Sequence, residues 1–242
     1  MSSYPSSKAG VLLAALLLAA CSQPPPPPPT GPTVNTAAGS EAVRLFEQAR
    51  SEGRGQLARA YADDILRKYP GSQAADTVRA ALPEIESMAA AEREITRRAN
   101  LWIYHAVGEV KGTTYTAFIY EAGSADTARD ERPQLVLRRH PEWGQNVYVL
   151  LPGGRFACGA RCSITIALDE TAPARFEASQ PDGAPVPAMF VEEHARFFEA
   201  LKTAQWLELE LPERDGKRSL RFEVGGIDLA RMGPAVQAEP RG

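Results

Sequence analysis

The chain has few of the residues that build catalytic and metal sites. Its 242 residues include only three cysteines and three histidines. His105, His140 and His194 lack the HExxH spacing of a zinc peptidase, and no GxSxG nucleophile motif accompanies them. The sequence therefore indicates neither of these hydrolase classes, and no metal or other cofactor is expected.

Concentrated positive charge is also missing. The chain has 27 Lys and Arg against 30 Asp and Glu, a formal net charge of −3, and no basic tract rises above this balance. Nucleic acid is therefore excluded as an expected partner. The glycine pairs at 153–154 and 225–226 lack the sequence context of a phosphate-binding loop, so we interpret them as turns.

No apolar run is long enough to cross a membrane comfortably. The longest, residues 9–20, is a dozen residues, whereas hydrocarbon of about 30 Å requires about 20. Lys8 precedes this run, and the small residues Ala19 and Ala20 end it, which is the pattern of a secretory signal peptide. We interpret residues 1–20 as that signal and disfavour a transmembrane helix.

The cleavage site of this signal contains a cysteine. Leu18-Ala19-Ala20-Cys21 resembles the lipobox of bacterial lipoproteins. The resemblance implies that Cys21 becomes the lipidated N-terminus, and several acyl chains give stable anchoring. Ser22, and not Asp, follows the cysteine. In Gram-negative lipoproteins this resemblance implies sorting to the outer membrane, where the protein would face the periplasm or the cell surface. The alternative is an ordinary secretory signal that a cysteine follows by chance.

A proline-rich tether is expected over residues 21–39. Six consecutive prolines at 24–29 favour polyproline II, a semi-rigid spacer of about 3.1 Å per residue. This spacer holds the folded part away from the bilayer. The rival interpretation is a proline-rich ligand for a partner.

Residues 40–99 carry helical periodicity. Ser40 is expected to cap the first helix, and Gly53 and Gly55 to end it. A second helix follows to about residue 69, a third spans about 73–82, and Pro83 opens a fourth.

The second of these helices and the turn after it carry a resemblance. The spacing of Tyr61, Ile65, Tyr69, Pro70 and Ala75 resembles tetratricopeptide repeats of outer-membrane assembly lipoproteins. The match covers about one repeat, and a stable solenoid needs about three. A plain helical hairpin packed on the next domain is the equal alternative.

From about residue 100 to 232 the pattern changes to short alternating strands. One helix, at about 191–203, interrupts them, and Asp215-Gly216 marks a hairpin between the last two. We predict an α+β protein, with N-terminal helical hairpins followed by an antiparallel β-sandwich or small barrel with one late helix. Residues 233–242 are expected to form a flexible tail. The predicted strands are Leu101–Val107, Thr113–Tyr120, Gln134–Arg139, Asn146–Leu151, Cys162–Leu168, Ala174–Ala178, Trp206–Leu211 and Ser219–Val224.

The β-rich segment also resembles a family. Its helix with Phe197 and Leu201, its closing strands and the Cys158/Cys162 pair resemble the periplasmic invasion-associated locus B proteins and related type VI secretion accessory proteins. The resemblance implies an exported β domain. A role in invasion is not carried over.

Cys158 and Cys162 remain once Cys21 is assigned to lipid. An exported compartment is oxidising, so the pair is expected to form a disulfide. A three-residue loop suits that geometry, and closing so short a loop contributes about 2 kcal/mol. Free or redox-active thiols are the alternative.

Two surfaces are candidates for binding. Tyr61 and Tyr69 lie on the predicted helical hairpin, and His140 and Trp143 lie in a predicted loop over 140–146. We interpret His140 as a surface histidine and Trp143 as the best binding anchor. At least two of the three tryptophans are expected in the core.

These features predict a lipid-anchored, non-catalytic envelope protein. Its function is protein–protein interaction or assembly at the outer membrane, with the membrane and an unidentified envelope protein as partners. The alternatives are a periplasmic or cell-wall hydrolase and a ligand-binding or inhibitor β domain.

Overall fold

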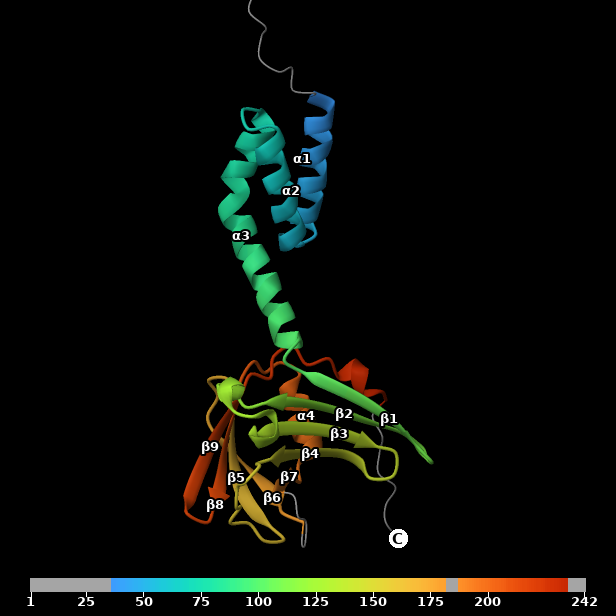
Figure 1. Cartoon of the computed structure of the whole chain (residues 1–242), viewed down its shortest axis with the longest axis vertical. Coiled ribbons are helices and arrows are strands. Elements are labelled where there is room, and N and C mark those ends of the chain that lie inside the picture. The colour runs from blue at the N-terminus through green and yellow to red at the C-terminus, as the bar shows by residue number, and fades with distance from the viewer. Residues whose placement is uncertain (1–35, 182–186, 235–242) are drawn as a thin grey trace, which may run out of the picture.

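The computed structural model describes residues 36–181 and 187–234 (Figure 1). The expected signal peptide, Cys21 and the proline tract lie outside the described residues, as does nearly all of the expected tail. No helix in the described ranges is long and apolar enough to span a membrane.

Three helices form the N-terminal part. They are α1 (Thr36–Ser51), α2 (Gly55–Lys68) and α3 (Gln73–Ala99). Phe46, Ile65 and Ile85, one from each helix, are fully buried in a common small core. The helical hairpins predicted from the sequence are therefore present, but α1 begins before Ser40, which lies inside that helix instead of capping it.

The third helix corrects a second prediction. Pro83 lies inside α3, which runs unbroken for 27 residues, so the predicted break at this proline is wrong. Proline removes one helical hydrogen bond and crowds the preceding turn. The buried stripe of Val78, Ala81, Ile85 and Ala89 continues across the proline, and its packing holds both halves in one helix. The Ser72 side chain caps the start of α3 by accepting from the Ala75 N–H at 3.2 Å.

The last turn of α3 joins the helical part to the sheet. Arg98 Nε lies 3.0 Å from a carboxylate oxygen of Glu223, and Arg97 contacts the same carboxylate. Trp102 follows the helix and donates from Nε1 to the Val224 carbonyl at 3.1 Å. Gly226 has φ +79°, and a Cβ there would lie 2.7 Å from the Ala99 nitrogen, so the closeness of this junction requires glycine.

The C-terminal part is one antiparallel sheet with strand order β1-β2-β3-β4-β7-β6-β5-β8-β9. It does not close, so the predicted sandwich or barrel takes the form of a single open sheet. A fourth helix, α4 (His194–Leu201), confirms the predicted late helix and completes the α+β class. The strands are β1 (Ile103–Glu109), β2 (Gly112–Tyr120), β3 (Gln134–His140), β4 (Gly144–Leu150), β5 (Cys162–Leu168), β6 (Ala174–Ser179), β7 (Ala188–Val191), β8 (Leu207–Glu213) and β9 (Gly216–Phe222).

The prediction missed β7. This strand has four residues, too few to show alternation. It lies in the sheet between β6, which precedes it, and β4, which is distant in sequence. The predicted hairpin at Asp215-Gly216 does join β8 and β9. Three short 3-10 helices complete the described chain: η1 (Ser124–Asp126), η2 (Arg129–Glu131) and η3 (Leu229–Met232).

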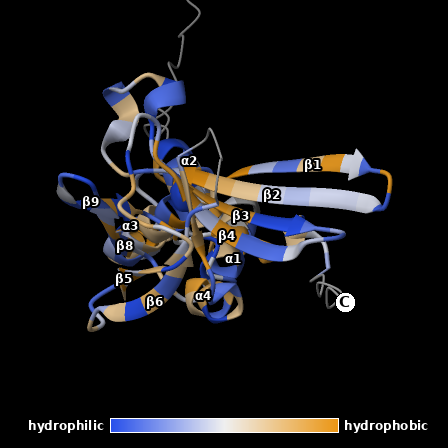
Figure 2. Cartoon of the chain, turned by 90° about the horizontal axis from the view of Figure 1, so that it is seen from below, coloured by the Kyte–Doolittle hydropathy of each residue, from blue (hydrophilic) through white to orange (hydrophobic). Residues whose placement is uncertain are grey.

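Alternation divides β1–β4 into an inner and an outer face. Leu135 and Leu137 of β3 point into the core, where Phe197 and Leu201 of α4 are also buried. Figure 1 shows α4 behind β2, β3 and β4, and Figure 2 shows the same arrangement from below. The opposite face of these strands is therefore turned away from the helix that covers the core.

The junction between α3 and the sheet predicts a pH effect. Hydrogen bonds from Arg97 and then Arg98 lower the pKa of Glu94 from 4.5 to about 2. A lowered folded-state pKa adds stability above the unfolded value, and this stability is lost as the pH falls from about 4.5 towards 2. Glu94→Gln should therefore lower the urea midpoint at pH 6 and have little effect near pH 2. Glu131→Gln, in η2, is the control, and an equal loss at both pH values would contradict the prediction.

Candidate functional site

The predicted site residues fall into separate places. Cys21 lies outside the described residues. A disulfide joins Cys158 to Cys162, whose Cα atoms are 5.3 Å apart. Tyr61 and Tyr69 are half-buried on the helical part, Tyr61 against its core and Tyr69 at the end of α2. Among the predicted binding residues, the structure brings together His140 and Trp143.

His140 is buried, so the prediction of a surface histidine is wrong. Its exposed fraction is 3% because β3 ends at His140 and a tight turn leads directly into β4. Nδ1 accepts hydrogen bonds from the N–H groups of Glu142 and Trp143, at 3.1 and 3.3 Å. The neutral ring must therefore carry its proton on Nε2, which lies 3.0 Å from Glu109 Oε2.

Glu109 receives a second contact that keeps it in place. The Thr114 hydroxyl donates to this carboxylate, and together with His140 it holds the pKa of Glu109 below its usual range. Thr114 belongs to β2 and Glu109 to β1, so this contact lies within the first hairpin, whereas the Glu109–His140 contact connects that hairpin to the end of β3. Gly112 lies close to Pro141, which places the tips of the two hairpins side by side.

Trp143 is stacked on the buried histidine. The two rings are 3.9 Å apart between centroids and inclined by 10°. The indole is nevertheless 54% exposed, and Val107 and Val110 of the neighbouring hairpin are also exposed. Trp102 is the only buried tryptophan and Trp206 is half-buried, so the expectation of two core tryptophans is wrong.

Arg138, which the sequence analysis did not select, lies beside this tryptophan. Its guanidinium carbon is 5.2 Å from the centre of the Trp143 ring and 5.8 Å from that of Tyr148. Burial raises the pKa of the Tyr148 hydroxyl, while the charge of Arg138 lowers it. The two rings and the guanidinium thus form one half-buried group on the outer face.

Arg139, the next residue, has a different environment. It points to the inner face, is 8% exposed, and donates from one nitrogen to the carbonyl oxygens of Leu229, Met232 and Gly233. Burial lowers the pKa of its guanidinium. Arg139 therefore holds the end of the described chain against the sheet, whereas Arg138 faces outward.

An apolar row crosses the outer face next to Arg138. The strand registers pair Ile103 with Phe118, Phe118 with Val136, Val136 with Tyr148, and Tyr148 with Phe190. Tyr148 and Phe190 contact each other with ring centroids 4.9 Å apart. We call the surface formed by Phe118, Tyr148, Phe190, Arg138 and Trp143 the aromatic face. Only strand register reveals it, because its residues are spread over β2, β3, β4 and β7 and the turn after β3.

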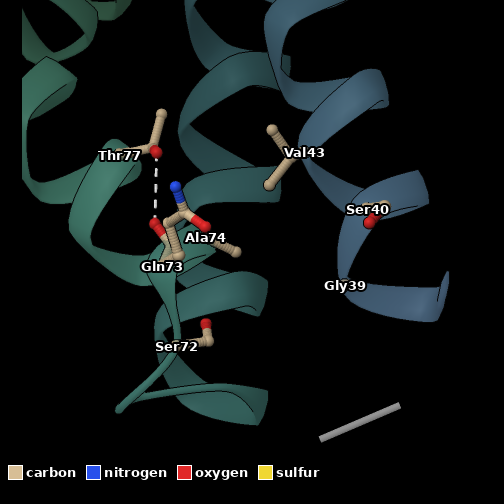
Figure 3. A pocket seen from close by; sticks show the side chains of 7 residues that line it. All are labelled: Gly39, Ser40, Val43, Ser72, Gln73, Ala74 and Thr77. Carbon is tan, nitrogen blue, oxygen red and sulfur yellow. Dashed lines mark hydrogen bonds between the residues drawn. The ribbon is translucent and has the colours of Figure 1, made fainter. Parts of the chain in front are cut away.

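A hollow of about 550 Å³ lies between α1 and the start of α3 (Figure 3). Its only polar side chains are those of Ser40, Ser72, Gln73 and Thr77, and none of its lining residues is titratable. The Thr77 hydroxyl donates to the Gln73 carbonyl at 3.1 Å, and the Ser72 hydroxyl caps α3. These groups serve the helix ends and provide no acid, base or nucleophile pair.

Possible metal ligands do not converge anywhere in residues 36–181 and 187–234. No group of three or more His, Cys, Asp or Glu side chains in these ranges is placed to hold a metal ion. The aromatic face is the candidate site because it combines an exposed indole with a guanidinium that has no ion-pair partner among the described residues.

No family model and no curated protein matches the chain. Among solved structures, the chain is similar to invasion associated protein B from Bartonella henselae, with 13% sequence identity and a TM-score of 0.35. The similarity covers 52% of this chain and 85% of that chain. The name of that protein agrees with the family that the β-rich segment resembles.

The hydrogen bonds of His140 predict its importance for stability. His140→Ala should lower the free energy of unfolding by about 1–3 kcal/mol, because two partly buried N–H groups lose their acceptor. His105→Ala, at an exposed position on β1, is the matched control and should change stability by less than about 0.5 kcal/mol. Urea unfolding measures both, and equal losses would contradict the assignment.

Proposed function

We propose that this chain is a lipid-anchored, non-catalytic protein of the cell envelope that binds a partner protein through the aromatic face. The observation that carries the proposal is Trp143, a large aromatic side chain that is 54% exposed although it is stacked on a buried ring. Tryptophan and arginine are enriched among residues that dominate binding energy.

The rigidity of this tryptophan supports binding. His140 is held by two backbone N–H groups and by Glu109, and Trp143 stacks on it in parallel. A side chain already ordered before association loses little conformational entropy on binding. Exposed Val107 and Val110 extend the apolar surface around it.

The length of the helical part supports a position of the aromatic face away from the anchor. As a helix of 27 residues, α3 is about 40 Å long. The ion pairs of Arg97 and Arg98 with Glu223 attach its end to the sheet. Together with the tether expected over residues 21–39, this helix holds the aromatic face at a distance from a bilayer bound by Cys21.

Photocrosslinking in cells tests the partner. A benzoylphenylalanine in place of Trp143 should yield a discrete adduct that mass spectrometry identifies as one envelope protein. The same probe in place of Lys217, an exposed residue on edge strand β9, is the control and should yield none. Absence of an adduct at position 143, or equal adducts at both positions, would count against the proposal.

Labelling with radioactive palmitate tests the anchor. The full chain should incorporate the label in a bacterial host, and Cys21→Ser should abolish incorporation because the thioether can no longer form. Cys158→Ser serves as the matched cysteine control and should retain the label. A label that persists in Cys21→Ser would exclude lipidation at this position.

A further inference from the structure

The guanidinium of Arg138 lacks a carboxylate partner. Within residues 36–181 and 187–234, no Asp or Glu oxygen lies within 4.0 Å of it, although the arginine is half-buried. Its Nε is shielded from solvent and has no hydrogen-bond partner among these residues. A shielded donor without an acceptor has lost its water without replacing it, so this position is unfavourable in the free chain.

The neighbouring carboxylates are already engaged. Glu109 accepts from Thr114 and His140, and Glu142 pairs with Lys111 at 2.5 Å. Neither acid forms an ion pair with Arg138, although the charge of Arg138 contributes to the lowered pKa of Glu109. The rings of Trp143 and Tyr148 lie beside the guanidinium, and its terminal nitrogens, unlike Nε, are not shielded, so an acceptor can approach them.

Resting on the proposed function, the geometry points to a specific ligand chemistry for the aromatic face. We propose that Arg138 binds the carboxylate of an acidic side chain in an extended segment of the partner protein. We choose an acidic side chain for two reasons. Its negative charge complements that of Arg138, and a planar guanidinium recognises a carboxylate through paired hydrogen bonds.

The strand spacing specifies a second feature of this segment. Val136, in the apolar row with Phe118 and Tyr148, precedes Arg138 by two residues on the same face of β3. Two residues of extended chain span about 7 Å. A segment that lies along β3 therefore places an acidic side chain over Arg138 and an apolar side chain, two residues away, over the row.

Binding of a defined peptide to the full chain in detergent tests this inference. The probe is a fluorescein-labelled peptide in which glutamate and phenylalanine are separated by one threonine, and anisotropy measures its affinity. Replacing the glutamate by glutamine should weaken binding about tenfold, as expected for loss of a hydrogen bond between charged groups. Arg138→Gln should weaken binding of the glutamate peptide to the same extent and abolish the difference in affinity between the two peptides.

Two further variants separate recognition from folding. Arg221→Gln is the matched control, because Arg221 stacks on Trp206 at 4.0 Å but already has Glu208 at 3.3 Å, and it should leave both affinities unchanged. Arg138→Lys keeps the charge but not the planar fork, and it should give an intermediate loss. The comparison of the two peptides on the unmodified chain remains decisive if Arg138→Gln does not fold.

The outcomes distinguish this inference from the proposed function. Equal affinity for the two peptides on the unmodified chain, or no binding of the glutamate peptide, overturns the inference. An adduct at position 143 that persists in Arg138→Gln leaves the proposed function intact and overturns the inference. Peptide discrimination that depends on Arg138, with no adduct in cells, supports the inference and counts against the proposed partner.

Discussion

The register of β3 between β2 and β4 is the constraint on which the β domain depends. It places Leu135 and Leu137 in the core and Val136 and Arg138 on the outer face. A shift of one residue would exchange these faces, because side chains alternate along a strand. The same register assembles the apolar row of the aromatic face, so the core and the candidate site arise from one pairing pattern.

Two adjacent arginines show how strongly this register acts. Arg139 turns inward and donates to backbone carbonyls near the end of the described chain. Arg138 turns outward beside Trp143 and Tyr148 and has no carboxylate or carbonyl partner among the described residues, although the Nε of each arginine is shielded and unpartnered. The first arrangement stabilises the fold. The second leaves the terminal nitrogens of Arg138 without a carboxylate partner in the described part of the outer face, and the inferred ligand chemistry rests on this arginine.

The junction at the end of α3 gives the fold its second constraint. Glu223 receives both Arg97 and Arg98, and Trp102 hydrogen-bonds to the segment that follows β9. Several polar contacts converge on a close backbone approach at Gly226, so the helical part is attached to the sheet through more than a flexible linker. The aromatic face is thereby connected to the helical part through a junction of several contacts.

Local patterns determined much of this protein. Amphipathic spacing, alternation and turn residues were sufficient to predict α1, α2, the late helix, the final hairpin and the α+β class, because each reflects interactions between residues close in sequence. Tertiary packing alone decided the continuity of α3 through Pro83, the insertion of β7 and the burial of His140. It also created the aromatic face, since the rings around Arg138 come from different strands and only cross-strand register brings them together.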